Sequence, residues 1–454
     1  MLTDSILAIV LAAGKGTRMA SAQPKVLHPL AGRPMLLHLL DTLEGISPAE
    51  TVIVVGPEMD ELKDAVDGHS LSPAVAVQKE RRGTGDAVRS GLAVTEITDA
   101  SNGTVLVLFG DTPLLTEETM RSLLQGRESD DAPGVVVLGF HTVSPGAYGR
   151  LVVDEDHHLQ SIIEAKDASN EELALNLCNS GLMAVDAGLL PLLLAKLSND
   201  NANREYYLTD IVALARAQGR SCTVVYGAET ELMGINTRAE LAEANAVIQH
   251  RLQQRAMAAG TTMQDPTSVY LSWDTAIGRD VTLEPNVVFG PGVTVADNVT
   301  IKAFSHIEGA SIKEGAVVGP FARLRPGAVI GPAAHIGNFV EIKNAIISSG
   351  AKANHLSYIG DAAIGPNANI GAGTITCNYD GFVKNKSEIG AGAFIGSNTA
   401  LVAPVKVGEG AIIGAGSVIT QDVEANSLAV DRSGQRNFAN WATKFRNRRR
   451  KQQG

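Results

Sequence analysis

The sequence predicts two domains of different architecture: a Rossmann-like α/β domain with a mainly parallel, mixed sheet, followed by a parallel β-helix. Up to about residue 230, short apolar runs alternate with amphipathic stretches. From Ile277 to Ile419, an aliphatic residue or Phe recurs at a period of six. Between these regions lies a stretch rich in Ala, Glu, Gln and Arg that ends at Gly260. We therefore expect a first domain over residues 1–235, a linker helix over residues 236–260, and a second domain with a basic tail over residues 261–454.

The first domain is expected to contain strands joined by helices. Apolar runs predict buried strands over residues 6–11, 51–55, 74–77 and 104–109. Amphipathic stretches predict helices over residues 35–43, 58–66 and 85–92, and a longer helix over residues 238–259. Strands that alternate with helices in this way are typical of a mainly parallel sheet covered by helices.

The second domain is expected to coil with one short strand per repeat. A hexapeptide period indicates a parallel β-helix with three strands per coil. Small residues stand two positions before many of the aliphatic ones, as Ala316 and Ala411 do, and Gly often follows them. An alternating β-sandwich is the alternative. The column is absent over residues 371–388, which we expect to form a loop thrown out of the coil, and loops on rigid scaffolds often carry function.

Composition excludes several classes of protein. The chain has 454 residues, 38 of them basic and 49 acidic, with a formal net charge of −11. This balance argues against a general nucleic-acid or membrane-surface binder, and no apolar run reaches the ~20 residues of a membrane span. Three cysteines without a CxxC pair exclude a disulfide framework and favour a cytoplasmic protein. Residues 6–13 are interpreted as a buried strand and not as a signal peptide.

The clustered cations that end the chain, Arg446 to Lys451, favour a solvated, disordered tail. Binding of a polyanionic ligand is the alternative.

A glycine-rich turn follows the first predicted strand. The run from Leu11 to Met19 reads LAAGKGTRM, and Pro24-Lys25 follows. It matches neither the Walker motif, because Ile9 replaces the first Gly, nor the Rossmann fingerprint, because Met19 replaces the third. Backbone N–H groups of such a turn can bind an anion, so we interpret it as a phosphate loop with Arg18 and Lys25 as added cations.

A second set of polar residues interrupts the predicted coil. Arg325 and Lys343 replace the usual small residue after the repeat aliphatic, and two outward cations on neighbouring coils can bind a phosphate. His355 stands between them and the expected loop. A histidine with a pKa near neutrality suits a general base that deprotonates an amine.

These motifs resemble two known groups of enzymes. The pattern L-x-x-G-x-G-T-x-M with P-K resembles the signature of sugar-nucleotide pyrophosphorylases, and the repeat half resembles hexapeptide-repeat acyltransferases, which coil left-handed. Gln78, Gly83-Thr84, Asp111 and the H-x-x-Y-x-G-D pattern from His355 extend the agreement. Together they resemble the bifunctional bacterial glucosamine-1-phosphate N-acetyltransferase / N-acetylglucosamine-1-phosphate uridylyltransferase family over nearly the whole chain. Phe109 departs from the family pattern, since it stands where Tyr is usual.

The resemblance implies an activity and a set of residues for the first domain. Uridylyl passes from UTP to N-acetylglucosamine 1-phosphate and pyrophosphate leaves, with Mg²⁺ held by Asp111 and Asn236, which suits its preference for oxygen ligands. Lys25 and Arg18 carry catalytic charge. The implied substrate contacts are Leu11, Ala12, Ala13, Gly14, Lys25, Phe109, Gly110 and Asp111, with Gln78, Gly83 and Thr84 on the uracil side, Gly149, Glu164 and Asn179 on the sugar side, and Asn236.

The resemblance also implies an activity for the second domain. Glucosamine 1-phosphate is acetylated first, from acetyl-CoA, with His355 as catalytic base. The sugar contacts are Arg325, Lys343, Tyr358 and Asn369, and the acetyl-CoA contacts are Ala372, Asn378, Tyr379, Ser397, Ala415 and Arg432. The family forms homotrimers with a shared acetyltransferase pocket, and its product supplies peptidoglycan and lipopolysaccharide precursors.

Two other interpretations stay open at this point. The repeat half could be a scaffold on a single-activity nucleotidylyltransferase, or the whole chain could be a non-catalytic assembly subunit. The first requires that the residues around His355 have no catalytic role. The second requires a degenerate phosphate loop or the loss of Asp111, and both of these are intact.

Overall fold

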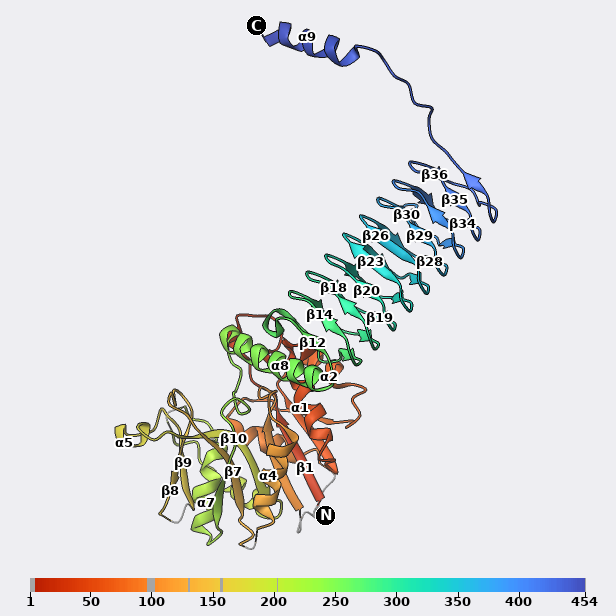
Figure 1. Ribbon diagram of the computed structural model, residues 1–454. Helices are drawn as coiled ribbons and strands as arrows, with labels where there is room; N and C mark the ends of the chain where they lie inside the picture. Colours follow the sequence, from red (N-terminus) through yellow and green to blue (C-terminus); the bar gives the residue numbers. More distant parts are fainter. Residues whose placement is uncertain (1–4, 96–102, 130, 156–157, 202, 454) are drawn as a thin grey trace. The chain divides into compact units, whose positions relative to one another are not determined.

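The computed structural model describes residues 5–95, 103–129, 131–155, 158–201 and 203–453. The chain divides into two compact units, Met1–Arg251 and Leu252–Gly454 (Figure 1). Within the described ranges, no helix is long and apolar enough to cross a bilayer.

The first unit is built on one mixed sheet. Its strand order is β11-β7-β10-β6-β1-β4-β5, with β8 and β9 beside β10. The neighbours of β1 run parallel to it, whereas β10 runs antiparallel between β6 and β7. The strands are β1 (Ser5–Leu11), β4 (Glu50–Val55), β5 (Ala74–Val77), β6 (Gly103–Phe109), β7 (Val135–His141), β8 (Arg150–Val153), β9 (Leu159–Ile163), β10 (Leu177–Asp186) and β11 (Cys222–Tyr226), and a separate ribbon contains β2 (Pro29–Leu30) and β3 (Arg33–Pro34).

Helices cover both faces of this sheet, as alternate residues of β1 show. Ile6, Ala8 and Val10 belong to the core that contains residues of α1, α2 and α4, whereas Leu7 and Ile9 belong to the core with α3, α6 and α7. The helices of this unit are α1 (Met35–Glu44), α2 (Asp60–Val66), α3 (Thr84–Leu92), α4 (Glu117–Arg127), α5 (Asn170–Leu173), α6 (Leu190–Ala195) and α7 (Ile211–Ala217), with 3-10 turns η1 (Thr17–Met19), η2 (Lys25–Leu27) and η3 (Leu208–Asp210). The boundary between the two units falls within α8 (Arg238–Ala258).

The expected strands and helices of this unit are present, and their ends differ from the expected ones by at most one residue, except at one start. The helix predicted from residue 58 begins at Asp60 instead. Glu58 has a φ of 62°, in the left-handed region, so it belongs to the preceding turn and cannot open the helix.

The second unit is a parallel β-helix made of three sheets. The first sheet contains β12 (Thr262–Met263), β14 (Thr282–Leu283), β17 (Thr300–Ile301), β20 (Val317–Val318), β23 (His335–Asn338), β26 (Lys352–His355), β29 (Asn369–Ile370), β32 (Phe394–Ile395), β35 (Ile412–Ile413) and β37 (Leu428–Ala429). The second contains β13 (Ala276–Ile277), β16 (Thr294–Val295), β19 (Ala310–Ile312), β22 (Ala328–Ile330), β25 (Ile346–Ile347), β28 (Ala362–Ile364), β31 (Ser387–Ile389) and β34 (Val405–Val407). The third contains β15 (Val288–Phe289), β18 (His306–Ile307), β21 (Arg323–Leu324), β24 (Glu341–Lys343), β27 (Tyr358–Gly360), β30 (Ile375–Cys377), β33 (Ala400–Val402) and β36 (Val418–Ile419).

The expected aliphatic column is confirmed as the core of this coil. Its members from Leu283 to Ile419 lie in one hydrophobic cluster, which the small residues Ala316, Ala334 and Ala411 share. Each strand pairs with the strand one coil further along, so the short strands form three sheets that run along the coil (Figure 1). A 3-10 turn, η4 (Pro266–Ser268), lies near its start.

Two expectations about this unit need correction. Residues 371–377 do not leave the coil, because β30 pairs with β27 and β33. Thr376 takes the place of the aliphatic residue: it is buried, and its hydroxyl exchanges hydrogen bonds with the Gly360 amide (2.8 Å) and carbonyl (3.0 Å). The extruded loop is therefore only residues 378–386. The basic tail is not disordered throughout, since α9 (Trp441–Gln453) forms there, and residues 431–452 are all exposed.

Candidate active sites

The phosphate loop in the first unit connects the end of β1 to η1 and η2. Gly16 has a φ of 59°, and a Cβ at this position would lie 2.6 Å from the Lys25 Cβ. Glycine is therefore required both for the turn and for the passage of Lys25 across it. This close approach brings Lys25 to the carboxyl end of the central strands, where open α/β sheets bind ligands.

Two of the expected residues, Asp111 and Asn236, meet at the side chain of a third, Lys25. Its ammonium donates to a carboxylate oxygen of Asp111 and to Oδ1 of Asn236, the latter at 2.9 Å. Lys25 and Asp111 are largely buried. Asp111 and Asn236 are 125 residues apart in sequence, and their oxygens are directed at one cation.

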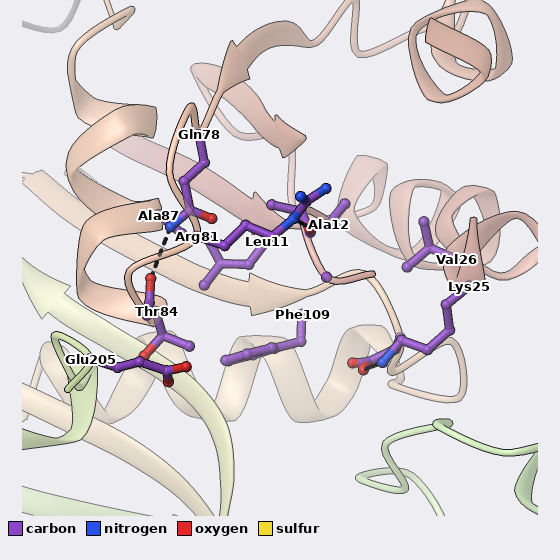
Figure 2. Close-up of a pocket in the computed structure, with 14 residues that line it drawn as sticks. Leu11, Ala12, Lys25, Val26, Gln78, Arg81, Thr84, Ala87, Phe109 and Glu205 are labelled. Carbon is purple, nitrogen blue, oxygen red and sulfur yellow. Dashed lines mark hydrogen bonds and ion pairs between the residues drawn. The ribbon is translucent and has the colours of Figure 1, made fainter. Parts of the chain in front are cut away.

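A pocket of about 280 Å³ opens beside this contact (Figure 2). Ten of the residues expected to contact substrate line it: Leu11, Ala12, Ala13, Gly14, Lys25, Gln78, Gly83, Thr84, Phe109 and Asp111. Val26, Arg81, Ala87 and Glu205 line it as well, and the sequence analysis did not identify them. A signal was available for Arg81, a charged residue between Gln78 and Gly83.

Hydrogen bonds within the segment from Gln78 to Thr84 shape one side of the pocket. The Gln78 amide nitrogen donates to the Gly83 carbonyl at 3.0 Å and to Asp86 at 3.1 Å. Gly83 has a φ of 105°, and a Cβ there would lie 2.7 Å from the carbonyl oxygen of Tyr206. The Thr84 hydroxyl accepts from the amide of Leu208 at 3.0 Å, which ties this segment to η3.

The expected sugar-side residues lie close to the pocket, although they do not line it. The Asn179 amide donates to the Gly149 carbonyl at 2.9 Å, and Oδ1 of Asn179 accepts from the Gly181 amide at 2.9 Å. The ring of Phe109, which lines the pocket, packs on Gly181. On another side, Glu164 accepts a hydrogen bond of 3.2 Å from Thr209 in η3, the turn that contacts Thr84 through Leu208.

The structure places two other expected residues differently. Arg18 in η1 is exposed and does not line the pocket, so its predicted role requires a movement or a ligand that extends to the rim. The Gly110 amide donates to the Leu11 carbonyl at 3.0 Å, so Gly110 joins β6 to the phosphate loop.

Burial gives Glu164 a raised pKa. Desolvation is the main cause, and the neighbouring carboxylates Asp210, Asp167 and Glu205 add to it, whereas the bond from Thr209 opposes it. The folded state therefore binds more protons at Glu164 than the unfolded chain does. The free energy of unfolding therefore decreases as the pH rises from the pKa of Glu164 in the unfolded chain, 4.5, through its higher pKa in the folded protein.

Glu164→Gln is therefore expected to raise the melting temperature at pH 8, by about 1–4 °C. The gain should disappear at pH values below the unfolded pKa, where the wild-type carboxyl is protonated in both states. Thermal unfolding at several pH values measures the difference, and Glu243→Gln, on the exposed side of α8, serves as control. A gain that is the same at every pH contradicts the assignment.

In the second unit, cations gather on the third sheet. The Leu324–Ile342 register between β21 and β24 places Arg325 beside Lys343 on adjacent coils. Lys384, from the loop over residues 378–386, lies next to Lys343 and lowers the pKa of its ammonium, with a smaller effect from Arg325. Glu341 pairs with Arg325 at 2.9 Å. The result is a partly exposed cluster of positive charges that favours an anion, and Lys384 is a member that the sequence analysis missed.

His355 ends β26 at the corner between the first and third sheets. Its Nδ1 donates to Oδ1 of Asn338, at 2.8 Å, on the preceding coil. With the proton on Nδ1, Nε2 keeps its lone pair, which is the arrangement that a general base needs. The imidazole is exposed, so a substrate can reach it.

Tyr358 and Asn378 pack together over Gly360. A Cβ at Gly360 would lie 2.4 Å from the Tyr358 hydroxyl and 2.9 Å from the Asn378 amide nitrogen. That amide nitrogen donates to Asp361, on the same coil as Tyr358. The loop beyond forms a small hairpin in which Tyr379 pairs with Lys384 and the Tyr379 hydroxyl donates to the Gly381 carbonyl at 2.6 Å.

Three of the expected acetyl-CoA contacts, Ala372, Ser397 and Ala415, lie in a column along the corner that carries His355. Continuing the strand register from Ala353–Ile370, Ile370–Ile395 and Ile395–Ile413 places one residue on each successive coil, in the order His355, Ala372, Ser397 and Ala415. Arg432 donates to the Ala415 carbonyl at 2.7 Å. Asn369 is different: it pairs with Lys352, three residues before His355, so it lies at the far end of its strand.

The oxygen atoms that meet Lys25 are potential ligands of a divalent cation. Within the described ranges, no cluster of three His, Cys, Asp or Glu side chains can hold a metal. Mg²⁺ does not require one, because it is commonly held by one or two protein oxygens plus substrate phosphates. Asp111 and Asn236 already share a cation, the Lys25 ammonium, so the residues fit the ion.

Comparison with known proteins finds a different family model in each of the two units. Residues 8–170 match a family model described as a MobA-like NTP transferase domain. Residues 274–309, 309–344 and 386–421 match bacterial transferase hexapeptide repeats, so the β-helix is of the left-handed hexapeptide type and the predicted fold class is confirmed.

Full-length relatives are also found. Proteins named bifunctional protein GlmU from Paramagnetospirillum magneticum, Rhodospirillum rubrum and Rhizorhabdus wittichii are 56%, 56% and 57% identical to this chain. The alignments cover 98%, 97% and 97% of the chain and 98%, 97% and 96% of the relatives. The chain therefore belongs to the GlmU family of bifunctional enzymes.

Proposed function

We propose that the chain makes UDP-N-acetylglucosamine in two steps, acetylation of glucosamine 1-phosphate by acetyl-CoA and then uridylyl transfer from UTP with release of pyrophosphate. The observation that carries this proposal is the presence of one reactive set of residues in each unit. Lys25, Asp111 and Asn236 meet beside a pocket in the NTP transferase domain. His355 and a cluster of cations lie on neighbouring coils of the hexapeptide repeats.

In uridylyl transfer, a phosphate oxygen of N-acetylglucosamine 1-phosphate attacks the α-phosphorus of UTP. The bond from that phosphorus to the β-phosphate oxygen breaks, and pyrophosphate carries the electron pair away. Neither reactant needs covalent activation, so catalysis depends on positioning and on charge neutralisation. Gln78, Gly83 and Thr84 hold the uracil side, and the Lys25 ammonium faces the phosphates.

Asp111 and Asn236 are the residues that would hold Mg²⁺, which supplies positive charge to the phosphates when bound. The Lys25 ammonium has to leave these oxygens for that purpose, and a phosphate group offers it a new partner. A lysine suits this exchange because it is a compact charge on a flexible stem.

In acetyl transfer, Nε2 of His355 accepts a proton from the amine of glucosamine 1-phosphate. The amine nitrogen attacks the thioester carbonyl, the C–S bond breaks, and the thiolate of CoA leaves and is protonated. Arg325, Lys343 and Lys384 bind the sugar phosphate, and Tyr358 with Asn378 borders it. Direct transfer needs no cysteine nucleophile, so Cys377 has no role in this step.

The corner column supports the assignment of acetyl-CoA. Neighbouring strands lie about 4.8 Å apart, so Ala372, Ser397 and Ala415 extend roughly 15 Å along the coil from His355. The side chains at all three positions are small, so they leave room for an elongated ligand along the corner. Arg432 and the Asn378-Tyr379 pair offer polar contacts near its borders.

Assays of both half-reactions on the purified protein test the proposal. Acetyl-CoA consumption is expected with glucosamine 1-phosphate, and pyrophosphate release is expected from UTP and N-acetylglucosamine 1-phosphate. Uridylyl transfer to the free amine sugar should be slower by about 10-fold or more, because the pocket loses contacts to the acetyl group. Equal use of both sugars contradicts the order of the steps, and absence of acetyl transfer leaves the repeat half as a scaffold.

We also propose that the chain works as a homotrimer with shared acetyltransferase sites. Exposed apolar side chains support this. Phe304, Phe321 and Phe339 stack on successive coils at 4.9 and 5.3 Å between ring centroids, and Leu356 continues the column next to His355. All four have φ values of 50–60°, which cost a bulky residue energy. Phe382, at the tip of the extruded loop, is 93% exposed.

Changing the stacked ring column tests this association. Asn occupies the same left-handed corner at Asn286 and Asn398, so the double variant Phe321→Asn/Phe339→Asn is expected to keep its coil. Light scattering should give about three times 47.5 kDa for the wild type and a shift toward one chain for the variant, with acetyl transfer lost in parallel. A monomeric variant with full acetyl transfer overturns the shared-site proposal.

Three further assignments complete the proposal. Asn369, at the far end of its strand from His355, is proposed to serve the site of a neighbouring chain. The functional division is proposed at residues 1–235 and 261–454, with α8 as the linker. A cytoplasmic location is proposed because all three cysteines are free.

A further inference from the structure

Arg81 makes a contact in the nucleotide pocket that the sequence motifs do not include. Its Nε donates to the carbonyl oxygen of Ala13 at 2.6 Å, across 68 residues of sequence. The guanidinium packs on Gly56, where a Cβ would lie only 2.1 Å from Nη2. Arg81 is half-buried and lines the pocket together with Ala13 and Gly14, as Figure 2 shows for its side chain next to Ala12 and Leu11.

Three hydrogen bonds fix the backbone of the phosphate loop where it leaves β1. The Ala12 amide donates to the Val54 carbonyl at 2.8 Å, and the Leu11 carbonyl accepts from Gly110 at 3.0 Å. Both bonds join the loop to neighbouring strand ends. The bond from Arg81 is the third, and it comes from a side chain. It acts at the Ala13–Gly14 peptide, where the chain has left the sheet and is no longer held by hydrogen bonds between strands.

The contact determines which way one peptide faces. A trans peptide is planar, with its C=O and N–H on opposite sides. When Arg81 holds the Ala13 carbonyl, the Gly14 N–H is turned to the side away from Arg81. Within the described ranges, the amides of Ala13, Gly14, Lys15 and Gly16 form no hydrogen bond. They are donors available to an anion.

We propose that Arg81 is a positioning residue for uridylyl transfer, which orients the Ala13–Gly14 peptide so that its N–H, and not its carbonyl, is offered to the triphosphate. The proposal rests on the UTP site of the proposed function. A carbonyl oxygen turned toward the phosphates repels them, and a misplaced donor is missing where negative charge develops. Preorganised backbone donors of this kind are worth about 10²–10³-fold in rate.

The position of Arg81 in the chain also links two parts of the site. Arg82, the next residue, pairs with Asp86 at 3.0 Å, and Asp86 in turn accepts from Gln78. Consecutive arginines therefore support different regions: Arg82 stabilises the uracil-side segment, and Arg81 reaches the phosphate loop.

Substitution of Arg81 tests the proposal. For Arg81→Gln, kcat/KM for UTP is expected to fall about 10- to 100-fold, with acetyl transfer unchanged. By calorimetry, affinity for uridine should stay at the wild-type value while affinity for UTP falls, since only the phosphates meet the loop. Arg81→Lys should recover part of the loss. Arg121→Gln is the matched control, because Arg121 donates to the Gly45 carbonyl at the same 2.6 Å, on α4.

A second variant displaces the Arg81 side chain without replacing it. The added methyl of Gly56→Ala collides with the far end of the Arg81 side chain, which can move aside while the fold remains. This variant should reproduce the defect of Arg81→Gln, and the double variant should be no worse than either single one.

Several outcomes overturn the proposal. They are an Arg81→Gln enzyme with wild-type kcat/KM, an equal loss of uridine and UTP affinity, and additive defects in the double variant. A wild-type chain that does not consume UTP contradicts the proposed function itself, so the two failures are distinguishable.

Discussion

His355→Ala is expected to reduce acetyl transfer to glucosamine 1-phosphate by about 10²–10⁴-fold and to leave uridylyl transfer at the wild-type rate. The imidazole is the base that we propose to take the proton of the attacking amine, and its Nδ1 is held by Asn338 at 2.8 Å. Steady-state rates of both half-reactions on the same preparation measure the difference. The defect should narrow as the pH rises, because more of the amine is then already deprotonated.

His306→Ala is the matched control for this variant. His306 faces outward from β18 on the third sheet, outside the column of His355, Ala372, Ser397 and Ala415, and it is expected to have no effect on either rate. A folded His355→Ala protein with more than a tenth of the wild-type acetyl transfer at neutral pH rules out general-base catalysis by this residue. Loss of both activities contradicts the separation of the two sites.

The repetitive half of the fold was predictable because its physics is local. Each six-residue repeat carries one aliphatic and one small residue, so a six-residue phase in the sequence identifies strands that the structure places in the three sheets of the coil. Prediction failed where a polar residue replaced the aliphatic one. Thr376 stays inside because its hydroxyl bonds to Gly360 on the preceding coil, and a partner 16 residues away is not visible in a local pattern.

The candidate sites were predictable as sets of residues and not as arrangements. The pocket gathers residues from three separate segments, with Lys25 on the first, Gln78 and Thr84 on the second and Asp111 on the third, as the family resemblance implied. Arg81 was missed because its importance comes from one carbonyl oxygen on another loop. Asn338 and Lys384 were missed for a similar reason, since each acts through a neighbour on another coil or loop.

Asp111→Ala is expected to lower uridylyl transfer by about 10³-fold or more and to spare acetyl transfer. The carboxylate is the charged partner of Lys25 and the charged member of the pair proposed to hold Mg²⁺. Its loss removes one ligand and leaves Lys25 bound to Asn236 alone, so phosphate charge is less well neutralised in the transition state. Pyrophosphate release at saturating UTP measures the effect. The rate of uridylyl transfer by Asp111→Asn should lie between those of the wild type and Asp111→Ala, because this variant keeps an oxygen but not the charge.

The control for Asp111→Ala has to remove a similar ion pair elsewhere in the same domain. Asp60 pairs with Lys63 at 2.8 Å on the surface of α2, and Asp60→Ala should change neither activity. If both aspartate variants lose uridylyl transfer to the same extent, the defect reflects stability and not the site. If Asp111→Ala retains activity and the same dependence on Mg²⁺ concentration as the wild type, the oxygens of Asp111 and Asn236 do not hold the ion, and the meeting of Lys25 with these two residues serves only to close the phosphate loop onto the sheet.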